Sequence, residues 1–268
     1  MKDPFSVEGK VTIITGGGSG IGAAMAREFT RRGAPVLIAG RTLEKLERTR
    51  DAIRKDGGRI ELKICDIADA AACDALIAET VRVFGRLDVM INNAGGGVPR
   101  ANAAEYTPEQ WHAVVATNLY GAAYCSKAAV LQFVKQKSGG VIINVSSTAG
   151  MYDQTGVSPY AAAKAGLINY TMSTAMEWAP LGIRVNCLTP GPILNERNSD
   201  PSAQTYREMI SKTRPLGRFG LAEEMAWPAI FLASDASGYI TGVNIPVEGG
   251  PGDRVNLLDP LTLYATRG

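Results

Sequence analysis

Short apolar runs, rich in β-branched residues, alternate along the chain with longer stretches in which apolar residues recur at helical spacing. Continuous apolar runs are typical of strands buried on both faces, and the longer periodic stretches are typical of helices that cover a sheet. We expect strands at about residues 11–15, 35–39, 60–65, 87–92, 140–146, 184–189 and 243–247. We expect helices at about residues 20–32, 42–56, 69–84, 107–136, 157–179, 203–212 and 222–234. This alternation predicts an α/β fold, doubly wound, with about seven parallel strands and helices on both faces.

Local signals support several of these boundaries. Thr107 before Pro108 is typical of a helix start, because the threonine side chain can accept a free amide hydrogen and proline lacks one. Arg31 and Arg32 before Gly33 are typical of a helix end, where cations face the free carbonyls. No linker, repeat or low-complexity tract divides the chain, so we predict a single domain over residues 1–268.

Two stretches lack a clear period. The segment at about 191–220 contains three prolines and follows a predicted strand end, so we expect it to cover a site there as a lid. The segment at about 251–268 is a C-terminal extension. Its apolar residues indicate that it packs on another surface, such as a neighbouring subunit: Leu257, Leu258, Leu261, Leu263 and Tyr264.

Composition excludes several classes of function. The 268 residues include 28 Lys and Arg and 26 Asp and Glu, mixed along the chain, so neither a nucleic-acid partner nor an acidic tail is indicated. The four cysteines are widely spaced and His112 is the single histidine, which argues against a metal site. Isolated thiols, no apolar run of about 18 residues and no secretory signal together favour a cytoplasmic protein without a membrane span.

A glycine-rich turn, Thr-Gly-Gly-Gly-Ser-Gly-Ile-Gly at residues 15–22, follows the first predicted strand and opens the first predicted helix. Gly16 permits a tight turn, and Gly20 and Gly22 permit backbone amides and the helix to approach closely. The positive N-terminus of a helix that begins near Ser19 can face a pyrophosphate. The turn therefore predicts a dinucleotide site at the end of the first strand.

A second group of residues indicates proton chemistry. Tyr160 and Lys164 are four residues apart in a predicted helix, so both lie on one side of it. A nearby ammonium, together with the positive nicotinamide of an oxidised cofactor, would lower the phenol pKa from about 10 towards neutral pH, where general acid–base catalysis is efficient. Ser147 follows a predicted strand, and its hydroxyl can donate to an oxygen that gains charge as hydride arrives. Its neighbour Ser146 is the competing candidate.

The chain resembles the short-chain dehydrogenase/reductase family. Besides the glycine turn, the matches are Asn92-Asn93-Ala94-Gly95, Asn118, Asn144-Val145-Ser146-Ser147, Tyr160-x3-Lys164 and Pro190-Gly191-Pro192-Ile193, in order over about residues 8–250. The resemblance implies a Rossmann-type fold and selects Ser147, Tyr160 and Lys164 as catalytic residues, with Asn118 holding a water that relays protons to Lys164. It implies that the following residues bind a nicotinamide dinucleotide: Gly16, Gly18, Ser19, Gly20, Ile21, Gly22, Arg41, Asp66, Ile67, Asn92, Asn93, Ala94, Gly95, Tyr160, Lys164, Pro190, Gly191 and Ile193.

Arg41 decides the expected cofactor. Where a cofactor without a 2′-phosphate usually meets an acidic residue, this chain has Gly40 followed by Arg41, whose guanidinium can pair with a phosphate dianion. We therefore expect NADP(H) rather than NAD(H). The sequence departs from many NADP-preferring relatives, which carry a second basic residue in the glycine turn, and has Gly18 and Ser19 there. A second departure is Asn195, where the family commonly has a threonine that touches the nicotinamide amide.

The resemblance implies hydride transfer between NADP(H) and a ketone or secondary alcohol. An enoyl-thioester (enoyl-CoA) reductase is the alternative, and a noncatalytic NADP(H)-binding regulator is a third hypothesis. Relatives are commonly homodimers or homotetramers, so we expect a homo-oligomer. Candidate residues of a mixed to apolar substrate pocket are Gly97, Val98, Pro99, Met151, Tyr152, Gln154 and Leu194, and Arg100 and Arg197 leave an acidic or acyl-thioester substrate open.

Overall fold

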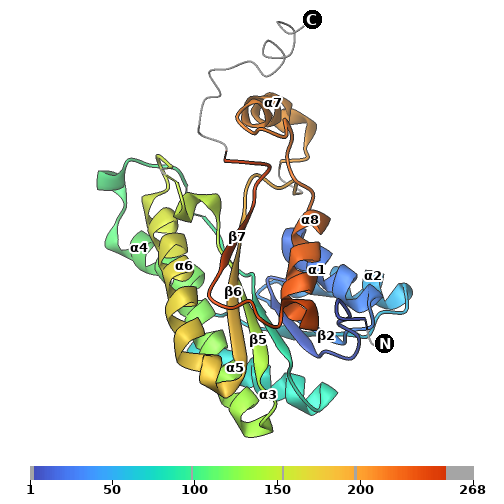
Figure 1. The fold of residues 1–268 in the computed structure, drawn as a ribbon. Coiled ribbons are helices and arrows are strands. Elements are labelled where there is room, and N and C mark those ends of the chain that lie inside the picture. Colours follow the sequence, from blue (N-terminus) through green and yellow to red (C-terminus); the bar gives the residue numbers. More distant parts are fainter. Residues whose placement is uncertain (1–2, 98, 153, 196–197, 252–268) are drawn as a thin grey trace, which may run out of the picture.

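The computed structural model describes residues 3–97, 99–152, 154–195 and 198–251. Its strands are β1 (Thr12–Thr15), β2 (Val36–Gly40), β3 (Ile60–Ile64), β4 (Val89–Asn92), β5 (Gly140–Val145), β6 (Ile183–Pro190) and β7 (Asn244–Val247). All neighbouring strands pair in parallel, and they form one seven-stranded sheet in the order β3-β2-β1-β4-β5-β6-β7 (Figure 1). The predicted α/β fold with parallel strands is confirmed.

Helices cover both faces of this sheet (Figure 1). They are α1 (Gly20–Arg31), α2 (Leu43–Lys55), α3 (Ala70–Phe84), α4 (Pro108–Val115), α5 (Gly121–Gln136), α6 (Ser158–Trp178), α7 (Gln204–Lys212) and α8 (Glu223–Ala233). Short 3-10 segments are η1 (Ala103–Glu105), η3 (Thr148–Gly150), η4 (Ala179–Leu181), η5 (Pro201–Ala203) and η6 (Asp235–Ser237).

Two apolar clusters fix the layers. Successive strand residues point to opposite faces, so Ile14 and Ile38 pack with α1, α2 and α8, whereas Ile13 and Leu37 pack with α3, α5 and α6. Because both faces are buried, strands such as β1 and β4 contain buried residues throughout. This burial explains why the strands appear in the sequence as short, mostly apolar runs.

The helix predicted over residues 107–136 is interrupted. A π-helical segment, η2 (Ala116–Tyr120), separates α4 from α5. Within it, the Asn118 side-chain amide donates to the Val114 carbonyl at 2.9 Å, an oxygen that an α-helix would give to the Asn118 backbone amide. The apolar pattern did not predict this interruption, because π-helical segments of this kind replace one backbone bond without changing which residues are apolar.

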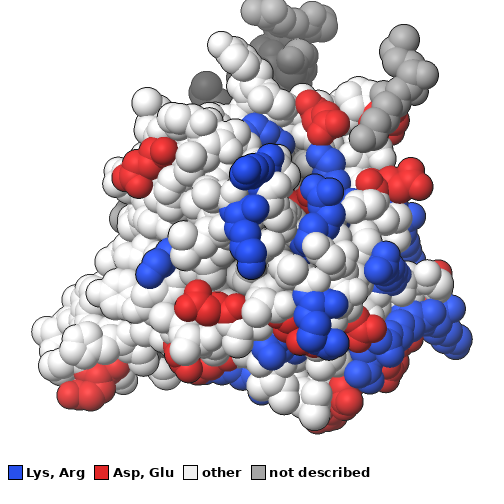
Figure 2. All heavy atoms as spheres, turned by 90° about the horizontal axis from the view of Figure 1, so that it is seen from below, with Lys and Arg blue, Asp and Glu red and all other residues white. Residues whose placement is uncertain are grey.

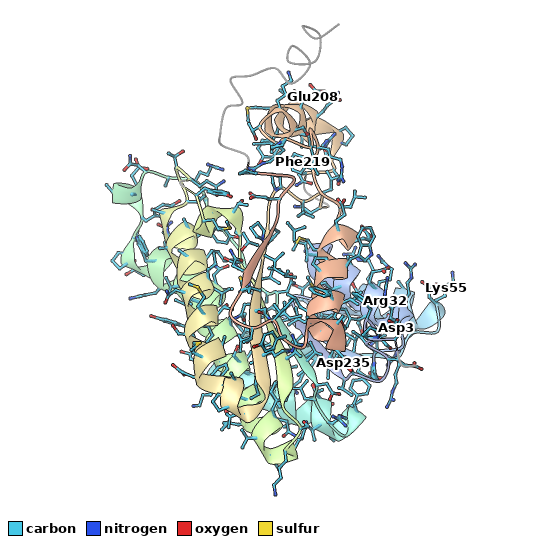
Figure 3. All side chains as sticks on the ribbon, viewed as in Figure 1. Asp3, Arg32, Lys55, Glu208, Phe219 and Asp235 are labelled. Carbon is cyan, nitrogen blue, oxygen red and sulfur yellow. The ribbon has the colours of Figure 1, made fainter. Side chains whose placement is uncertain are left out.

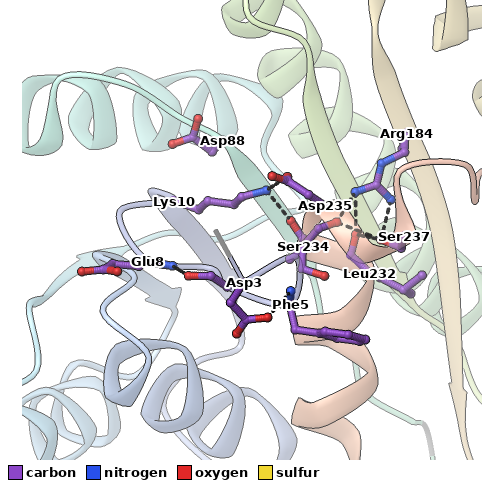
Figure 4. Close-up of polar contacts among 12 residues, drawn as sticks. Asp3, Phe5, Glu8, Lys10, Asp88, Arg184, Leu232, Ser234, Asp235 and Ser237 are labelled. Carbon is purple, nitrogen blue, oxygen red and sulfur yellow. Dashed lines mark hydrogen bonds and ion pairs between the residues drawn. The ribbon is translucent and has the colours of Figure 1, made fainter. Parts of the chain in front are cut away.

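The N-terminal segment is tied to the end of α8 (Figure 4). Lys10 Nζ donates to the Ala233 carbonyl at 3.0 Å and to Asp235 Oδ1 at 2.7 Å. Arg184 on β6 donates to the carbonyls of Leu232 and Ser234 at 2.9 and 3.2 Å (Figure 4). Carbonyls in the last turn of a helix lack intrahelical partners, and cations stabilise them. These contacts fix α8 on the sheet.

The 191–220 segment, with η5 and α7, lies beyond the carboxyl ends of the strands (Figure 1). Figure 3 labels Glu208 and Phe219 in this region. Its two ends meet at a narrow base, where Leu194 N donates to the Gly220 carbonyl and Gly220 N donates to the Pro192 carbonyl, both at 2.9 Å. The segment is therefore a closed loop attached to the sheet near β6.

At the amino ends of the strands, acidic and basic side chains stand side by side on the surface (Figure 2). No helix in the described part of the chain is both long and apolar enough to cross a bilayer. Four thiols, at Cys65, Cys73, Cys125 and Cys187, are free and buried.

Some residues considered above lie outside the described residues: Val98, Arg197 and the C-terminal Leu257, Leu258, Leu261, Leu263 and Tyr264.

Candidate active site

The site lies where the strand order changes direction, between β1 and β4. Strands on either side of this point send their helices to opposite faces, which leaves a crevice at their carboxyl ends. The turn after β1 enters that crevice with Gly16 at a φ of +67°. A Cβ on Gly16 would lie 2.9 Å from the Ala94 Cα, and one on Gly22 would lie 2.3 Å from the Gly16 carbonyl oxygen. Only glycine fits this approach of turn, helix and β4 end.

The N-terminus of α1 faces this crevice without a side-chain cap. Ser19 is the N-cap residue, its backbone is extended, and its hydroxyl makes no capping bond. The first amides of a helix lack intrahelical partners and carry partial positive charge, so they suit an anion. Uncapped amides beside a cradle that admits only glycine fit a pyrophosphate.

A hollow of about 270 Å³ opens beside the turn, and we call it the switch-point hollow. Its walls come from the carboxyl ends of β1, β2, β3 and β4, together with η2. They consist of Gly16, Gly18, Ser19, Gly40, Arg41, Thr42, Lys45, Leu46, Cys65, Asp66, Ile67, Ala94, Gly95 and Thr117. The structure thus brings together eight of the residues predicted to bind the cofactor: Gly16, Gly18, Ser19, Arg41, Asp66, Ile67, Ala94 and Gly95.

Two cations line one end of the hollow. Arg41 follows β2, and Lys45 lies in the first turn of α2, four residues later. Both are exposed, and neither pairs with an acidic residue in the part of the chain that the structure describes. Sequence reasoning identified Arg41 but missed Lys45.

Thr15 and Asn93 join the ends of β1 and β4. The Thr15 hydroxyl accepts from the backbone amides of Asn93 and Ala94 at 3.1 and 3.0 Å, and Asn93 Nδ2 donates to the Thr15 carbonyl at 2.9 Å. Asn92, by contrast, points away from the hollow. Its amide donates to Ser126 Oγ and to Asn144 Oδ1, both at 2.8 Å, so its side chain joins β4 to β5 and α5. The Asn92 side chain therefore has a structural role between strands, and its contact with the cofactor stays a prediction.

Ser147 and Tyr160 meet at the end of β5. Ser147 is the N-cap of η3, where its Oγ accepts from the Ala149 amide at 3.2 Å. The Ser147 hydroxyl faces the Tyr160 phenol closely enough to lower the phenol pKa. Ser146 points elsewhere, since its hydroxyl donates to the Lys164 carbonyl at 2.8 Å and is buried. The geometry therefore selects Ser147 over Ser146 as the partner of Tyr160.

Lys164 lies beneath this pair. Its side chain is buried, Nζ donates to the Val145 carbonyl at 2.8 Å, and Nζ is 5.8 Å from the centroid of the Tyr160 ring. Burial lowers the Lys164 pKa from its ordinary value to about 8, while the nearby Cys187 acts weakly in the opposite direction. Gly95 passes close by, since a Cβ there would lie 3.2 Å from Nζ. Lys164 thus connects the catalytic candidates with the wall of the hollow.

The Tyr160 phenol does not have a lowered pKa in the protein alone. Burial raises its pKa, and the nearby Ser147 hydroxyl lowers it by less. We expected the Lys164 ammonium to lower this pKa, but the ammonium makes its hydrogen bond to the Val145 carbonyl. The chain itself therefore favours the protonated phenol, which is the form that donates a proton.

Asn118 holds the loop after β4. Its Nδ2 donates to the Gly96 carbonyl at 2.8 Å, and its Oδ1 accepts from the Gly96 amide at 3.1 Å. Together with the bond from Nδ2 to the Val114 carbonyl, these contacts give both the nitrogen and the oxygen of the Asn118 side chain a partner in the protein. Its side chain fixes Gly95 and Gly96 beside Lys164, a contact that the sequence did not predict.

Residues after β6 form a separate wall. Gly191 N donates to the Val247 carbonyl at 3.0 Å, and a Cβ on Gly191 would lie 2.7 Å from the Glu248 Cα. Ile193 is buried at the base of the 191–220 segment. Pro190, Gly191 and Ile193 are absent from the walls of the switch-point hollow. The Asn195 Oδ1 accepts from the Asn198 amide at 3.1 Å, so Asn195 is held inside the segment.

Comparisons with known proteins agree with this architecture. A family model described as enoyl-(acyl carrier protein) reductase matches residues 16–251. A Bacillus subtilis protein provisionally named 2,4-dienoyl-CoA reductase is 39% identical over 91% of this chain and 97% of its own. The 3-oxoacyl-[acyl-carrier-protein] reductase of Thermotoga maritima is 37% identical over 91% of this chain and 98% of its own.

A solved structure extends the likeness to a bound cofactor. The Agrobacterium tumefaciens protein provisionally named 2-deoxy-D-gluconate 3-dehydrogenase, crystallised with NADP, superposes with a TM-score of 0.84 at 32% identity, over 92% of this chain and 98% of its own. The fold, the site and these matches together define an oxidoreductase. The chain belongs to the short-chain dehydrogenase/reductase family.

Proposed function

We propose that this protein is an NADP(H)-dependent oxidoreductase that interconverts a ketone and a secondary alcohol. The observation that carries the proposal is the Ser147 and Tyr160 hydroxyls side by side, with the Lys164 ammonium 5.8 Å from the centroid of the Tyr160 ring. This group lies next to a hollow whose turn and uncapped helix suit a dinucleotide.

The cofactor would be held by the chain's own backbone and cations. The amides at the start of α1, beside Gly20, Ile21 and Gly22, would bind the pyrophosphate, and Asp66 and Ile67 would border the adenine end. When bound, the nicotinamide supplies or accepts the hydride. The protein contributes position, exclusion of water and a proton.

Tyr160 is the proton donor for reduction. Its phenol is protonated at neutral pH, because burial raises its pKa, and it can donate to a carbonyl oxygen that gains negative charge. The Ser147 hydroxyl, held beside the phenol, donates to the same oxygen and orients it. In the balanced reduction, carbon receives the hydride and oxygen receives the Tyr160 proton. Lys164, partly charged near its pKa of about 8, restores that proton.

Asn118 would complete the proton path to Lys164, as we expected from the family. Its side chain is engaged with Gly96 and Val114, so its contribution is to hold the β4 loop and the η2 backbone around Lys164. We assign it a positioning role in proton supply.

Arg41 and Lys45 support NADP(H) over NAD(H). Both cations line the hollow next to Gly40, where an acidic residue would favour a free ribose hydroxyl. A phosphate dianion suits two cations that lack an acidic partner among the described residues. The NADP found with the Agrobacterium tumefaciens relative supports the same preference.

An enoyl-thioester reductase is the second candidate, favoured by the description of the family model and by the name of the Bacillus subtilis relative. The paired Ser147 and Tyr160 hydroxyls favour carbonyl chemistry, because they direct two donors at one oxygen. A noncatalytic NADP(H)-binding regulator is the third candidate, and turnover of any substrate by the purified protein would exclude it.

Oxidation of NADPH and of NADH, each with a panel of ketones and with an enoyl-CoA, tests the proposal. We expect turnover of at least one ketone with NADPH and slower turnover with NADH. Turnover of the enoyl-CoA alone would favour the second candidate, and turnover of nothing while NADPH binds would favour the third.

We also propose a homo-oligomer, a dimer or tetramer. Apolar side chains on the outer faces of α5 and α6 support association: Leu131, Val134, Met172 and Met176 are exposed.

Four reduced, buried thiols support a cytoplasmic location.

A further inference from the structure

Three separate segments converge beyond the end of β7. Arg214 lies two residues after the end of α7, Glu248 follows β7, and Tyr152 follows the Ser147 turn. Tyr152 Oη donates to Glu248 Oε1 at 2.9 Å. Arg214 NH1 faces the other carboxylate oxygen, Oε2, at 3.6 Å. Glu248 therefore stands between the 191–220 segment and the turn that carries Ser147.

The ion pair is buried but loose. The side chains of Arg214 and Glu248 are 9% and 5% exposed. Among the described residues, Arg214 Nε and NH1 and Glu248 Oε2 have no hydrogen-bond partner. Buried charges are costly unless they are closely paired, and well-formed Arg–carboxylate bonds measure about 2.7–2.9 Å. A shift of roughly 1 Å would turn this contact into a charge-assisted hydrogen bond.

Tyr152 is rigidly connected to the catalytic candidates. Gly150 N donates to the Ser147 carbonyl at 2.9 Å, and Tyr152 N donates to the Thr148 carbonyl at 2.9 Å. The turn also packs directly on α6, since a Cβ on Gly150 would lie 2.6 Å from the Lys164 carbonyl carbon. The residue that carries the Tyr152 hydroxyl is thus connected to Ser147 through one short hydrogen-bonded turn.

The 191–220 segment has a second attachment at this place. Leu216 N donates to the Gly249 carbonyl at 3.0 Å, and a Cβ on Gly250 would lie 2.6 Å from the Pro215 ring. Together with the base at Ile193 and Gly220, these contacts hold both ends of the segment, while α7 between them has no buried residue. The Arg214–Glu248 contact is where the segment meets the Ser147 turn through side chains.

We propose that Glu248 is a positioning residue that couples the lid to the reacting hydroxyls. This inference rests on the proposed function. As the lid closes over substrate, Arg214 approaches Glu248 and completes the ion pair, while Glu248 keeps its bond from Tyr152 and so fixes the Ser147 turn. Glu248 is not among the residues that line the switch-point hollow. Its effect falls on substrate affinity, because the completed pair stabilises the closed lid.

The variants Tyr152→Phe, Glu248→Gln and Arg214→Met test this coupling. Glu208→Gln is the matched control, because it makes the same change on exposed α7, where Glu208 accepts from Gln204 at 2.9 Å. The kinetic probe is the ketone with the highest turnover in the NADPH assay. For the lid itself, the probe is trypsin cleavage after Arg207 and Lys212, which needs no turnover.

We expect Glu248→Gln and Arg214→Met to raise the KM for ketone about tenfold or more, the weight of one charge-assisted contact, with kcat within about threefold of the parent. Tyr152→Phe, which removes only a hydroxyl, gives a smaller rise. The KM for NADPH stays unchanged, and trypsin cleaves the lid faster in the Glu248 and Arg214 variants than in Glu208→Gln. A lower melting temperature and lower kcat with unchanged ketone KM in all three variants would show a structural role only and overturn the proposal.

Trypsin separates this proposal from the proposed function. If no ketone is turned over, the proposed function fails, and faster lid cleavage in Glu248→Gln than in Glu208→Gln still supports the coupling. Equal cleavage of those two variants overturns it. If Glu248→Gln does not fold, Tyr152→Phe is compared with the parent instead. A higher KM for ketone and faster trypsin cleavage of the lid in Tyr152→Phe then support the coupling, and equal values overturn it.

Discussion

Replacing Arg41 and Lys45 with alanine should convert the cofactor preference of this protein. Both side chains line the switch-point hollow and are exposed. A charge-assisted hydrogen bond is worth about 1.5–3 kcal/mol, and solvent screening reduces an exposed contact to about 1 kcal/mol. Since about 1.4 kcal/mol is a factor of ten, each substitution should lower kcat/KM for NADPH about fivefold, and the pair about 25-fold. NADH, which lacks the phosphate, should lose nothing.

The assay compares kcat/KM for NADPH and NADH at one ketone concentration, in the parent, the two single variants and the double variant. Lys55→Ala, at the far end of α2, is the control for a lost exposed cation. The NADPH advantage should also shrink at high salt, because exposed charges are screened. An unchanged NADPH-to-NADH ratio in Arg41→Ala, or equal use of both cofactors by the parent, would refute the reasoning.

Four further predictions concern the remaining site residues. Ser147→Ala should lower kcat about 100-fold with little change in NADPH binding, and an undiminished kcat would exclude its role as oxyanion donor. Because burial lowers the Lys164 pKa to about 8, the ammonium is lost as pH rises through that value, so kcat for reduction should fall above about pH 8. A Lys164→Arg variant, whose cation persists, should lack this decline. Identical pH profiles of kcat in the parent and in Lys164→Arg would contradict the assignment. Gly22→Ala places a methyl group 2.3 Å from the Gly16 carbonyl, so fluorescence titration should show lost NADPH affinity. Gly57→Ala, which strains a backbone with a φ of +80° but meets no atom within 4 Å and lies away from the hollow, should bind NADPH normally. Asn118→Ala removes both bonds to Gly96 and should speed hydrogen exchange in residues 94–97, which unchanged exchange would contradict.

Much of the fold could be predicted because its strands are buried on both faces. β1 and β4 appear in the sequence as short runs that are mostly apolar or β-branched, and all seven strands lie within one or two residues of the predicted ranges. The π-helical segment at Ala116–Tyr120 could not be predicted, because it depends on one side-chain bond from Asn118 to Val114. Apolar periodicity carries no information about that bond.

The candidate site was predictable where local spacing fixes geometry. Tyr160 and Lys164 lie one helical turn apart, and Gly16 and Gly22 occupy positions that only glycine can fill. Contacts between distant segments were not predictable. The Arg214–Glu248 pair joins the stretch after α7 to the end of β7, and the Asn92 side chain is turned inward because β5 presents Asn144 beside it. Both contacts depend on which segments the fold brings together, and local sequence patterns do not determine this.

The phenol pKa was the one electrostatic expectation that the structure changed. We expected Lys164 and the nicotinamide of the oxidised cofactor to lower it together. In the protein alone the ammonium has the Val145 carbonyl as its partner, and burial of Tyr160 raises the pKa. The direction of a shift depends on solvent exposure, which residue spacing does not determine.

Turnover by Tyr160→Phe tests the central claim most directly. This variant keeps the ring and removes only the hydroxyl that we assign as proton donor. With NADPH and the best ketone of the panel, kcat should fall at least about 1,000-fold, within the range for loss of a general acid, while NADPH binds with unchanged affinity. A kcat within about tenfold of the parent, at equal NADPH affinity, would show that the phenol does not carry the reaction.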